Sequence, residues 1–271
     1  PLYSSAASDV YKRQNLPVTQ VSDLVVEEND LVISTHGRSF WVMEDVGPLR
    51  QLTPEVAEAG FWLFDPTDPV RGFDNSVNVQ YWLAEDAETV RFEFLDADGT
   101  VLRTFESEPE DEEEEEEEGG GGFFGGGSPT PSAEAGAHTF RWNQRLEGWT
   151  DFEGRIFWAA GNVGPAVLPG RYEVRLTVDG ASMSQEFEIE MNPRAAAEGV
   201  TMADLRERFE LSSQIRDRVS DANQAVLRIR SIEDQMSDRL EDTDDARVEA
   251  LAGTIGTRLN EVEGEIYQVQ N

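Results

Sequence analysis

TVRFEFLDADGTVLRTFE, residues Thr89–Glu106, is the stretch that decides the fold class of this chain. Apolar and polar residues alternate in two runs, Thr89–Asp96 and Val101–Glu106, which is the period of a strand with one buried face. Between the runs lies Ala97–Asp98–Gly99, and Asp-Gly readily supplies the positive φ angles of a tight hairpin turn. The stretch therefore predicts a β-hairpin inside a mainly β domain.

The same alternation recurs on both sides of this hairpin. The further predicted strands are Ser76–Ala84, Ala137–Asn143, Arg155–Ala159, Arg171–Val178 and Ser184–Glu190. Asp179–Gly180 marks a second hairpin between the last two. Several short strands with turn signals between them are typical of two packed sheets, so we predict a β-sandwich over residues 76–192.

A low-complexity segment, Glu108–Ser132, interrupts the predicted sandwich. It holds an acidic run, Glu110–Glu118, followed by the glycine-rich Gly119–Gly127. Such a composition cannot bury a core, and flexible carboxylates lack the fixed geometry of a cation site. We interpret residues 108–132 as a disordered insertion between two strands rather than as a domain boundary, because loop length costs little closure entropy.

The part of the chain before the sandwich reads as three short strands. Val21–Val26, Asp30–Ser34 and Phe40–Glu44 fall within residues 15–52 and are separated by tight polar turns. Three strands in this length make most of a β-propeller blade, and a lone blade cannot bury both of its faces. We therefore expect preceding blades to cover this segment.

Two shorter segments complete the amino-terminal half. Residues 1–14 (PLYSSAASDVYKRQ) match nothing that follows and hold the only lysine, Lys12; we interpret them as a non-native leader. Residues 53–75 contain Pro54, Pro66 and Pro69 and are predicted to be an irregular connector with one helical turn.

Residues 200–271 predict an antiparallel helical hairpin. Apolar residues recur at helical spacing in both halves, and Thr201 with Asp204 forms a capping-box-like start. The second stripe consists of Val248, Leu251, Ile255, Leu259, Val262, Ile266 and Val269. Two interpretations stay open for these stripes: a hairpin core that packs on the sandwich, and a coiled coil that dimerises.

The bulk composition excludes several classes of function. The chain has 271 residues, 55 acids against 22 bases, a net charge of -33 and no cysteine. Such a charge repels nucleic acids and anionic lipids, and the lack of cysteine excludes disulfides and thiolate sites. No apolar run approaches the roughly 18 residues of a membrane span. We expect neither nucleic acid nor a membrane span.

A family resemblance enters at the second and third predicted strands and the turns before them. The matching residues are Asn29, Asp30, Leu31, Val32, Thr35, His36, Gly37, Arg38, Phe40, Trp41 and Asp45. This pattern resembles the last blade of bacterial sortilin-like, BNR-repeat propeller proteins, often described as glycosyl hydrolases; Glu44 stands where that family has Asp. Phe92–Arg103 and Leu168–Val178 look like the immunoglobulin-like module of flagellar hook-capping proteins, and Leu205–Leu240 looks like the tail of the propeller family.

This resemblance implies a carboxy-terminal fragment of a periplasmic or secreted protein: a partial propeller blade, an immunoglobulin-like sandwich and a helical hairpin. Its expected partners are the upstream blades of the same parent protein, together with a glycan or peptide ligand. Three functions stay open: a non-catalytic accessory region of a parent that is a glycoside hydrolase, part of a non-enzymatic propeller that binds peptides or proteins, and a carbohydrate-binding module.

Four residues are candidates for ligand binding. His36 and Arg38 would stand at the propeller mouth, although a simple turn, in which Gly37 relaxes the backbone and both side chains pair with neighbouring loops, is the simpler explanation of them. Trp149 and Trp158 flank a loop and would stack on sugar rings, whereas Trp142 sits in a strand and reads as core. We predict no catalytic residue, no cofactor and no metal site, because a lone histidine without a nucleophile or a positioned carboxylate is not a mechanism.

Overall fold

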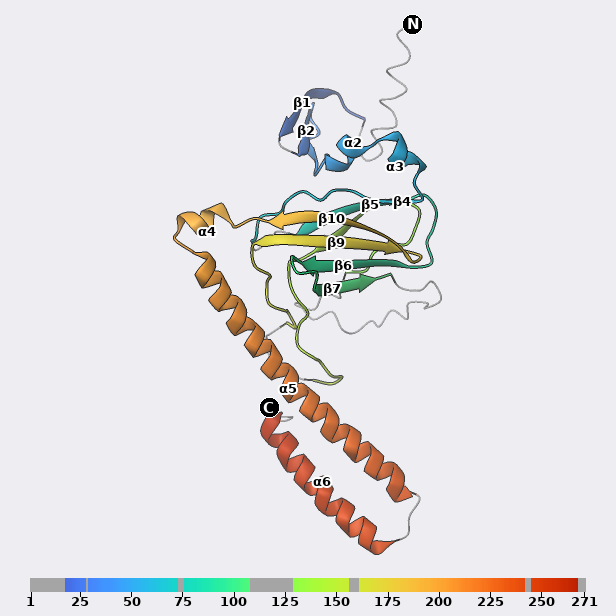
Figure 1. The fold of residues 1–271 in the computed structure, drawn as a ribbon, viewed down its shortest axis with the longest axis vertical. Coiled ribbons are helices and arrows are strands. Elements are labelled where there is room, and N and C mark those ends of the chain that lie inside the picture. The colour runs from blue at the N-terminus through green and yellow to red at the C-terminus, as the bar shows by residue number, and fades with distance from the viewer. Residues whose placement is uncertain are drawn as a thin grey trace.

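The structure is a computed structural model that describes residues 18–27, 29–72, 76–107, 129–155, 161–241 and 245–267. The chain is mainly β, with three antiparallel sheets followed by a pair of long helices. Figure 1 shows a small sheet at one end, two packed sheets in the middle and the helix pair extending from the other end. The predicted class, mainly β with a carboxy-terminal helical hairpin, is confirmed at this level.

The small sheet contains β1 (Val21–Glu27), β2 (Asp30–Thr35) and β3 (Phe40–Met43), paired in that order. Two short helices, α2 (Gly47–Gln51) and α3 (Pro54–Glu58), follow it and lie between this sheet and the rest of the molecule (Figure 1). The predicted helical turn at Pro54 is α3.

The middle of the molecule is a two-sheet unit, in which the inner faces of the two sheets share one core. One sheet has the order β4 (Phe61–Leu63), β5 (Val77–Leu83), β8 (Gly136–Trp142). The other has the order β10 (Ala181–Ile189), β9 (Gly170–Val178), β6 (Val90–Asp96), β7 (Val101–Glu106). The hairpin predicted from Thr89–Glu106 is β6–β7, and the hairpin predicted at Asp179–Gly180 is β9–β10.

The core of the two-sheet unit is aromatic. Phe92 and Phe94, on the inner face of β6, stack on Phe140 and Trp142 of β8, with ring centroids 4.9 and 4.4 Å apart respectively. All four rings are buried. Trp142 is therefore a core residue, as expected, and aromatic pairs of this kind contribute about 0.5–1.5 kcal/mol each beyond the area they bury.

The predicted connector, residues 53–75, differs from the structure in one respect. It contains strand β4, in which Trp62 pairs with Trp82 of β5, and its Leu63 side chain is fully buried in the core. The connector is thus not wholly irregular, because its aromatic segment adds an edge strand to the two-sheet unit. A run of three residues is too short to display a strand period, which is why the sequence did not indicate it.

Three predictions fall wholly or mostly outside the described residues. These are the leader at 1–14, the acidic insertion up to residue 128, and most of the expected strand Arg155–Ala159. The turn between β6 and β7 is described, and there Asp96 Oδ1 accepts hydrogen bonds from the backbone N–H groups of Asp98 and Thr100, at 3.0 and 2.9 Å. This carboxylate stabilises a turn, as the Asp-Gly signal predicted.

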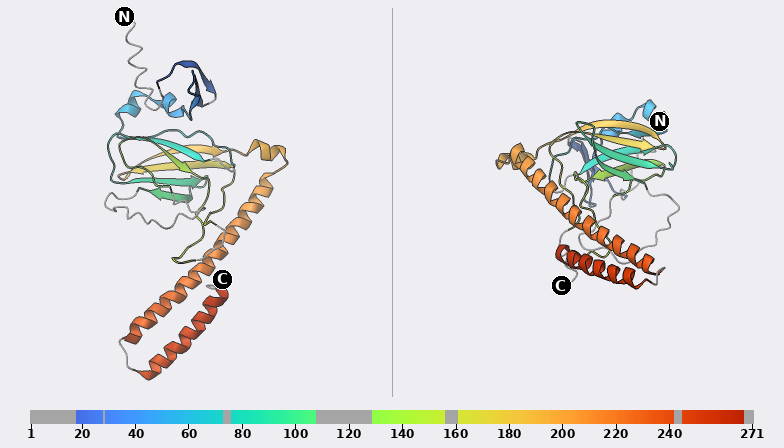
Figure 2. Two further views of the ribbon diagram at one scale, coloured as in Figure 1. Left: turned by 180° about the vertical axis from the view of Figure 1, so that it is seen from behind. Right: turned by 60° about the horizontal axis from the view of Figure 1, so that its bottom comes forward.

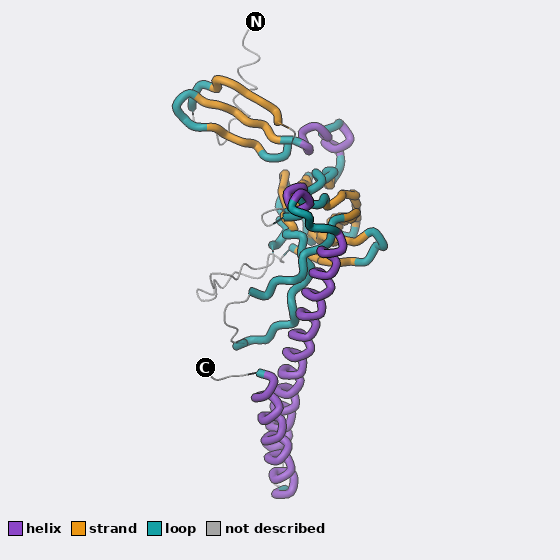
Figure 3. Tube along the Cα trace, turned by 90° about the vertical axis from the view of Figure 1, so that its left-hand side faces the viewer, coloured by secondary structure: helices purple, strands orange, loops and turns teal. Residues whose placement is uncertain are grey.

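The carboxy-terminal helices are α4 (Pro193–Ala197), α5 (Met202–Glu241) and α6 (Ala246–Ile266). The start of α5 is a capping box, because Asp204 accepts from the backbone N–H of Thr201 at 2.8 Å while Thr201 Oγ1 accepts from the N–H of Asp204 at 3.3 Å. Figures 2 and 3 show α5 running alongside the two-sheet unit and continuing beyond it, with α6 folded back against its distal half.

Most of the described apolar stripe of α6 is exposed. Leu251 is 61% exposed, and Val248, Ile255, Val262 and Ile266 are also exposed. Leu259 is half-buried, and Val269 falls outside the described residues. The face turned toward α5 carries Glu263, which is buried, and Gly256, beside Met236. The described stripe is therefore mostly an open apolar surface, which differs from the interpretation of it as hairpin core.

Candidate functional site

His36 and Arg38 lie in the turn between β2 and β3, and both side chains are exposed. The turn is held by its backbone: the His36 N–H donates to Gln20 O at 2.9 Å, and the indole N–H of Trp41 donates to Arg38 O at 2.9 Å. Gly37 adopts a φ of +77°, which glycine accepts without strain. This arrangement fits the turn interpretation and brings no second functional group to the two side chains.

Two acids of the family-like motif have structural roles. Asp30 Oδ1 accepts from the N–H of Asp45 at 3.0 Å, which ties β2 to a residue two positions before α2. Asp45 in turn accepts from Thr67 Oγ1 at 3.2 Å and from Gln80 Nε2 at 3.1 Å. Asp45 therefore joins the small sheet to the two-sheet unit, although its φ of +52° is an uncommon conformation for a residue other than glycine.

The small sheet exposes apolar side chains on both faces. Adjacent residues of a strand point to opposite sides, and Leu24 and Val25 of β1 are both about half exposed, at 54% and 50%. On β3, Phe40 is 73% exposed and Met43 is 47% exposed, again on opposite faces. None of the described residues of β1, β2 or β3 is buried. Figure 3 shows this sheet set apart from the strands of the two-sheet unit.

Trp149 lies in the loop that follows β8, and Trp158 falls outside the described residues. The guanidinium of Arg155 lies over the Trp149 ring, 5.5 Å from its centroid. Asn162 holds the Trp149 backbone from across the loop, accepting from its N–H at 2.8 Å and donating to its carbonyl at 2.9 Å. Among the described residues, Arg155 lies against the Trp149 indole.

The two arms of this loop, residues 144–155 and 161–167, lie unusually close together. Leu146 N–H donates to Pro165 O at 2.9 Å, and Val167 N–H donates to Gln144 O at 2.8 Å. A Cβ atom on Gly164 would stand 2.0 Å from the Leu146 carbonyl oxygen, far inside any real contact. Only glycine fits there, so the pairing of the arms depends on that residue.

The loop also attaches the long helix to the two-sheet unit. Thr150 N–H donates to Ser220 Oγ at 3.0 Å, and Asn223 Nδ2 donates to Thr150 O at 2.7 Å. Phe152 meets Tyr267, at the end of α6, edge to face with a centroid distance of 5.3 Å. Both long helices are therefore held by the loop that carries Trp149.

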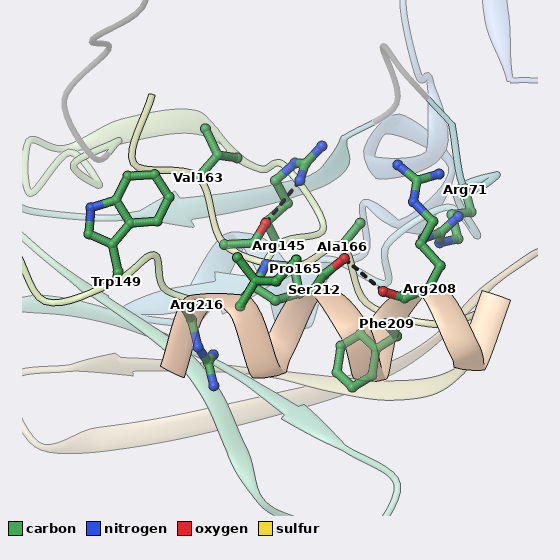
Figure 4. Close-up of a pocket in the computed structure, with 12 residues that line it drawn as sticks. Arg71, Arg145, Trp149, Val163, Pro165, Ala166, Arg208, Phe209, Ser212 and Arg216 are labelled. Atoms are coloured by element: carbon green, nitrogen blue, oxygen red, sulfur yellow. Dashed lines mark hydrogen bonds between the residues drawn. The ribbon is translucent and has the colours of Figure 1, made fainter. Parts of the chain in front are cut away.

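Between this loop and α5 lies a cavity of about 220 Å³, which we call the arginine pocket. Its charged lining consists of Arg71, Arg145, Arg208 and Arg216, and its apolar lining includes Trp149, Val163, Pro165 and Phe209. Figure 4 shows the lining residues, which come from the loop, from the segment before β5 and from the first half of α5.

Backbone carbonyls hold two of the guanidinium groups. Arg71 Nε donates to Val167 O at 2.7 Å, and Arg145 Nη1 donates to Gly164 O at 2.9 Å. Burial lowers the pKa of Arg71, and the positive charges of Arg208 and Arg145 lower it further. Burial and then Arg208 also lower the pKa of Arg145. The pocket thus concentrates the positive charges of Arg71, Arg145 and Arg208, which form no ion pair with any described residue.

Sequence reasoning missed this cluster because its members lie far apart in the chain. Arg71, Arg145 and Arg208 are contributed by three different segments of a strongly acidic chain. Of the three earlier candidates that the structure describes, His36, Arg38 and Trp149, only Trp149 lines the pocket. A site that tertiary packing assembles from distant residues cannot be predicted from a local sequence motif.

Comparison with known proteins finds no matching family model and no match among curated proteins. Within the described ranges no group of three or more His, Asp or Glu side chains is placed to hold a metal ion. A search of the described helices finds no stretch with the length and hydropathy that crossing a bilayer requires.

Proposed function

We propose that this chain is the non-catalytic, carboxy-terminal accessory region of a secreted BNR-repeat propeller protein, in which β1–β3 belong to the last blade. The observation that carries the proposal is the exposure of apolar side chains on both faces of that sheet. A blade in a propeller lies between two neighbours, so both of its faces are built to be covered. A sheet on the surface of a single domain needs only one apolar face.

The amount of exposed apolar area supports a missing cover. Phe40, Val42 and Leu24 are each more than half exposed. Burial of a side chain of this size is worth about 1.5–3 kcal/mol. A single exposed apolar residue is ordinary, but a whole sheet that exposes both faces indicates an interaction surface.

The two-sheet unit supports the second part of the resemblance, an immunoglobulin-like sandwich. Its seven strands divide as β4-β5-β8 and β10-β9-β6-β7, with β5–β8 and β6–β9 each joining strands that are distant in the chain. Tyr172, near the start of β9, donates from its hydroxyl to Leu168 O at 2.6 Å. A tyrosine that bonds back to the backbone a few residues upstream is a recurring feature of immunoglobulin-like sandwiches.

In this proposal the two-sheet unit and the helix pair brace the propeller or present it to a polymer or protein partner. Hydrolytic chemistry, in a parent that is a glycoside hydrolase, belongs to the other blades. The extracytoplasmic location rests on the family resemblance alone.

The proposal is tested by sequencing the open reading frame upstream of the codon for Asn15 and by expressing the longer protein that this frame encodes. We expect further four-stranded repeats upstream. Phe40→Ser should then change the stability of the present chain little, since Phe40 is largely exposed, and should destabilise the longer chain by about 2–3 kcal/mol because it removes a buried contact.

Val101→Ser is the matched control, since Val101 is an exposed strand residue of the two-sheet unit. It should have the same small effect in both chains. A native start codon just before Asn15, or equal effects of Phe40→Ser in the two chains, would contradict the proposal.

A further inference from the structure

Three arginines from three separate segments converge on the arginine pocket. Arg71 follows the bridge between Val70 and Glu190, Arg145 follows β8, and Arg208 lies in the second turn of α5. Figure 4 shows the Arg208 side chain extending from α5 beside Arg71, with Arg145 between these two and Val163. The positive charges of Arg208 and Arg145 lower the pKa of Arg71, so the three groups repel one another and bringing them together costs free energy.

No carboxylate compensates these three groups in the part of the chain that the structure describes. The ion pairs there involve other arginines, including Arg216, which lines the same pocket and pairs with Asp217 at 2.6 Å. The chain has 55 acidic residues against 22 basic ones, so a guanidinium that needed only a structural partner would find one easily. The arrangement leaves cationic donors directed at a cavity.

The donors that remain are suited to a small anion. Arg71 and Arg145 each use one N–H on a backbone carbonyl of the loop, which fixes the guanidinium planes and leaves their other N–H groups unused by any described side chain. Arg208 makes no side-chain hydrogen bond to a described residue. A guanidinium matches an oxyanion with two parallel hydrogen bonds, and two fixed groups are preorganised for it.

We propose that the arginine pocket binds an oxyanion, a carboxylate, sulfate or phosphate group, held by Arg71, Arg145 and Arg208. The cavity of about 220 Å³ is larger than a bare anion needs. Its apolar wall of Trp149, Val163 and Pro165 leaves room for a small ring attached to the charged group. The two sources to separate are therefore a free inorganic oxyanion and an acidic sugar.

A bound anion would also stabilise the contact between the segment before β5, the loop and α5, where the pocket lies. The three arginines belong to the segment before β5, the loop and α5, so an anion between them replaces mutual repulsion with shared attraction. Ligand binding stabilises the folded chain by mass action, and the midpoint of thermal unfolding should rise with ligand concentration.

The test is calorimetric titration of the full chain at constant ionic strength, with chloride as the balancing anion. The probes are inorganic sulfate, inorganic phosphate and glucuronate, with glucose as the uncharged counterpart of glucuronate. Arg208→Gln is the informative variant, because Arg208 is exposed and makes no described side-chain bond, so its replacement leaves the fold intact. Arg206→Gln, two residues away and outside the pocket lining, is the matched control.

We expect saturable binding of at least one charged probe, about tenfold weaker in Arg208→Gln and unchanged in Arg206→Gln, as loss of one charge-assisted hydrogen bond predicts. Tighter binding of glucuronate than of sulfate or phosphate, with glucose inert, identifies an acidic sugar; the reverse order identifies an inorganic oxyanion. Absence of saturable binding by all three anions overturns the proposal. Equal affinities of Arg208→Gln and the unsubstituted chain also overturn it, provided the circular dichroism spectra agree.

Discussion

Arg230 on α5 donates two hydrogen bonds to one oxygen of Glu263 on α6, from Nε at 3.1 Å and from Nη2 at 2.9 Å. The same guanidinium lies over the ring of Phe152, 4.8 Å from its centroid. Because Phe152 belongs to the loop after β8, Arg230 contacts both long helices and the loop. It occupies the point at which the three parts of the carboxy-terminal half meet.

Glu263→Gln should loosen α6 from α5. The substitution keeps the size of the side chain but removes the charge from a pair whose carboxylate is nearly buried, and a hydrogen bond to a charged group is worth about 1.5–3 kcal/mol. Hydrogen exchange of the α6 amides measures the effect. Glu265→Gln, exposed on the same helix, is the control, and equal protection of α6 in the two variants would contradict the role given to Glu263.

Leu63→Ala tests whether β4 belongs to the core of the two-sheet unit. Leu63 is fully buried, and removal of a buried leucine side chain costs about 2–5 kcal/mol. Leu52→Ala, which truncates a leucine that is more than half exposed, should cost much less. Urea unfolding monitored by tryptophan fluorescence compares them, and a small effect of Leu63→Ala would mean that β4 is detached in solution.

Two glycine substitutions should have opposite signs. Gly164→Ala places a Cβ against the Leu146 carbonyl, so we expect the two loop arms to separate and the unfolding midpoint to fall. A Cβ on Gly253 of α6 meets nothing within 4 Å, and Gly253→Ala should stabilise the helix by up to about 1 kcal/mol. Differential scanning calorimetry gives both signs, and a neutral Gly164→Ala would refute the close approach of the arms.

Stability should fall as the pH rises above 10. Burial raises the pKa of Tyr81 to about 12, and burial raises the pKa of Tyr172 to about 12 as well. The ordinary value is about 10, so between pH 10 and 12 the unfolded chain loses these protons first and unfolding is favoured. The stabilisation is complete below pH 10 and is lost as the pH passes through 12.

Urea unfolding at pH 9 and pH 11 measures this change. The double substitution Tyr81→Phe with Tyr172→Phe should flatten the pH dependence. A double variant as sensitive to pH as the unsubstituted chain would assign the alkaline transition to other groups.

Short sequence patterns correctly predicted the strands, turns and helix ends that depend on interactions between neighbouring residues. The alternation in Thr89–Glu106 and its Asp-Gly turn located β6 and β7 within one residue, and the Thr201–Asp204 capping box located the start of α5. Helical periodicity did not predict which part of the molecule the apolar stripe of α6 would contact. The stripe containing Leu251 and Ile255 was correctly identified as apolar, but nothing in a helical repeat states which neighbour the stripe faces.

The candidate site shows the same limit more sharply. Aromatic and charged residues beside turns and loops are what a sequence makes visible, and they indicate His36, Arg38, Trp149 and Trp158 as candidates. The structure describes a cavity whose charged lining is Arg71, Arg145, Arg208 and Arg216, and of the three described candidates only Trp149 lines it. Tertiary packing brings these arginines together from distant positions. Their spacing in the sequence therefore forms no pattern from which the site could be predicted.

The continuity of α5 gives the molecule a mechanical property. Its 40 residues span about 60 Å at 1.5 Å per residue. The loop contacts α5 from Ser220 to Arg230, so the last three turns of the helix, which end at Glu241, extend about 17 Å beyond those contacts. A tilt of α5 by about 10° about these contacts moves its distal end by about 3 Å, given that length. Because the helix is continuous, a displacement at the proximal end, beside Arg208, is transmitted to the far end of the molecule.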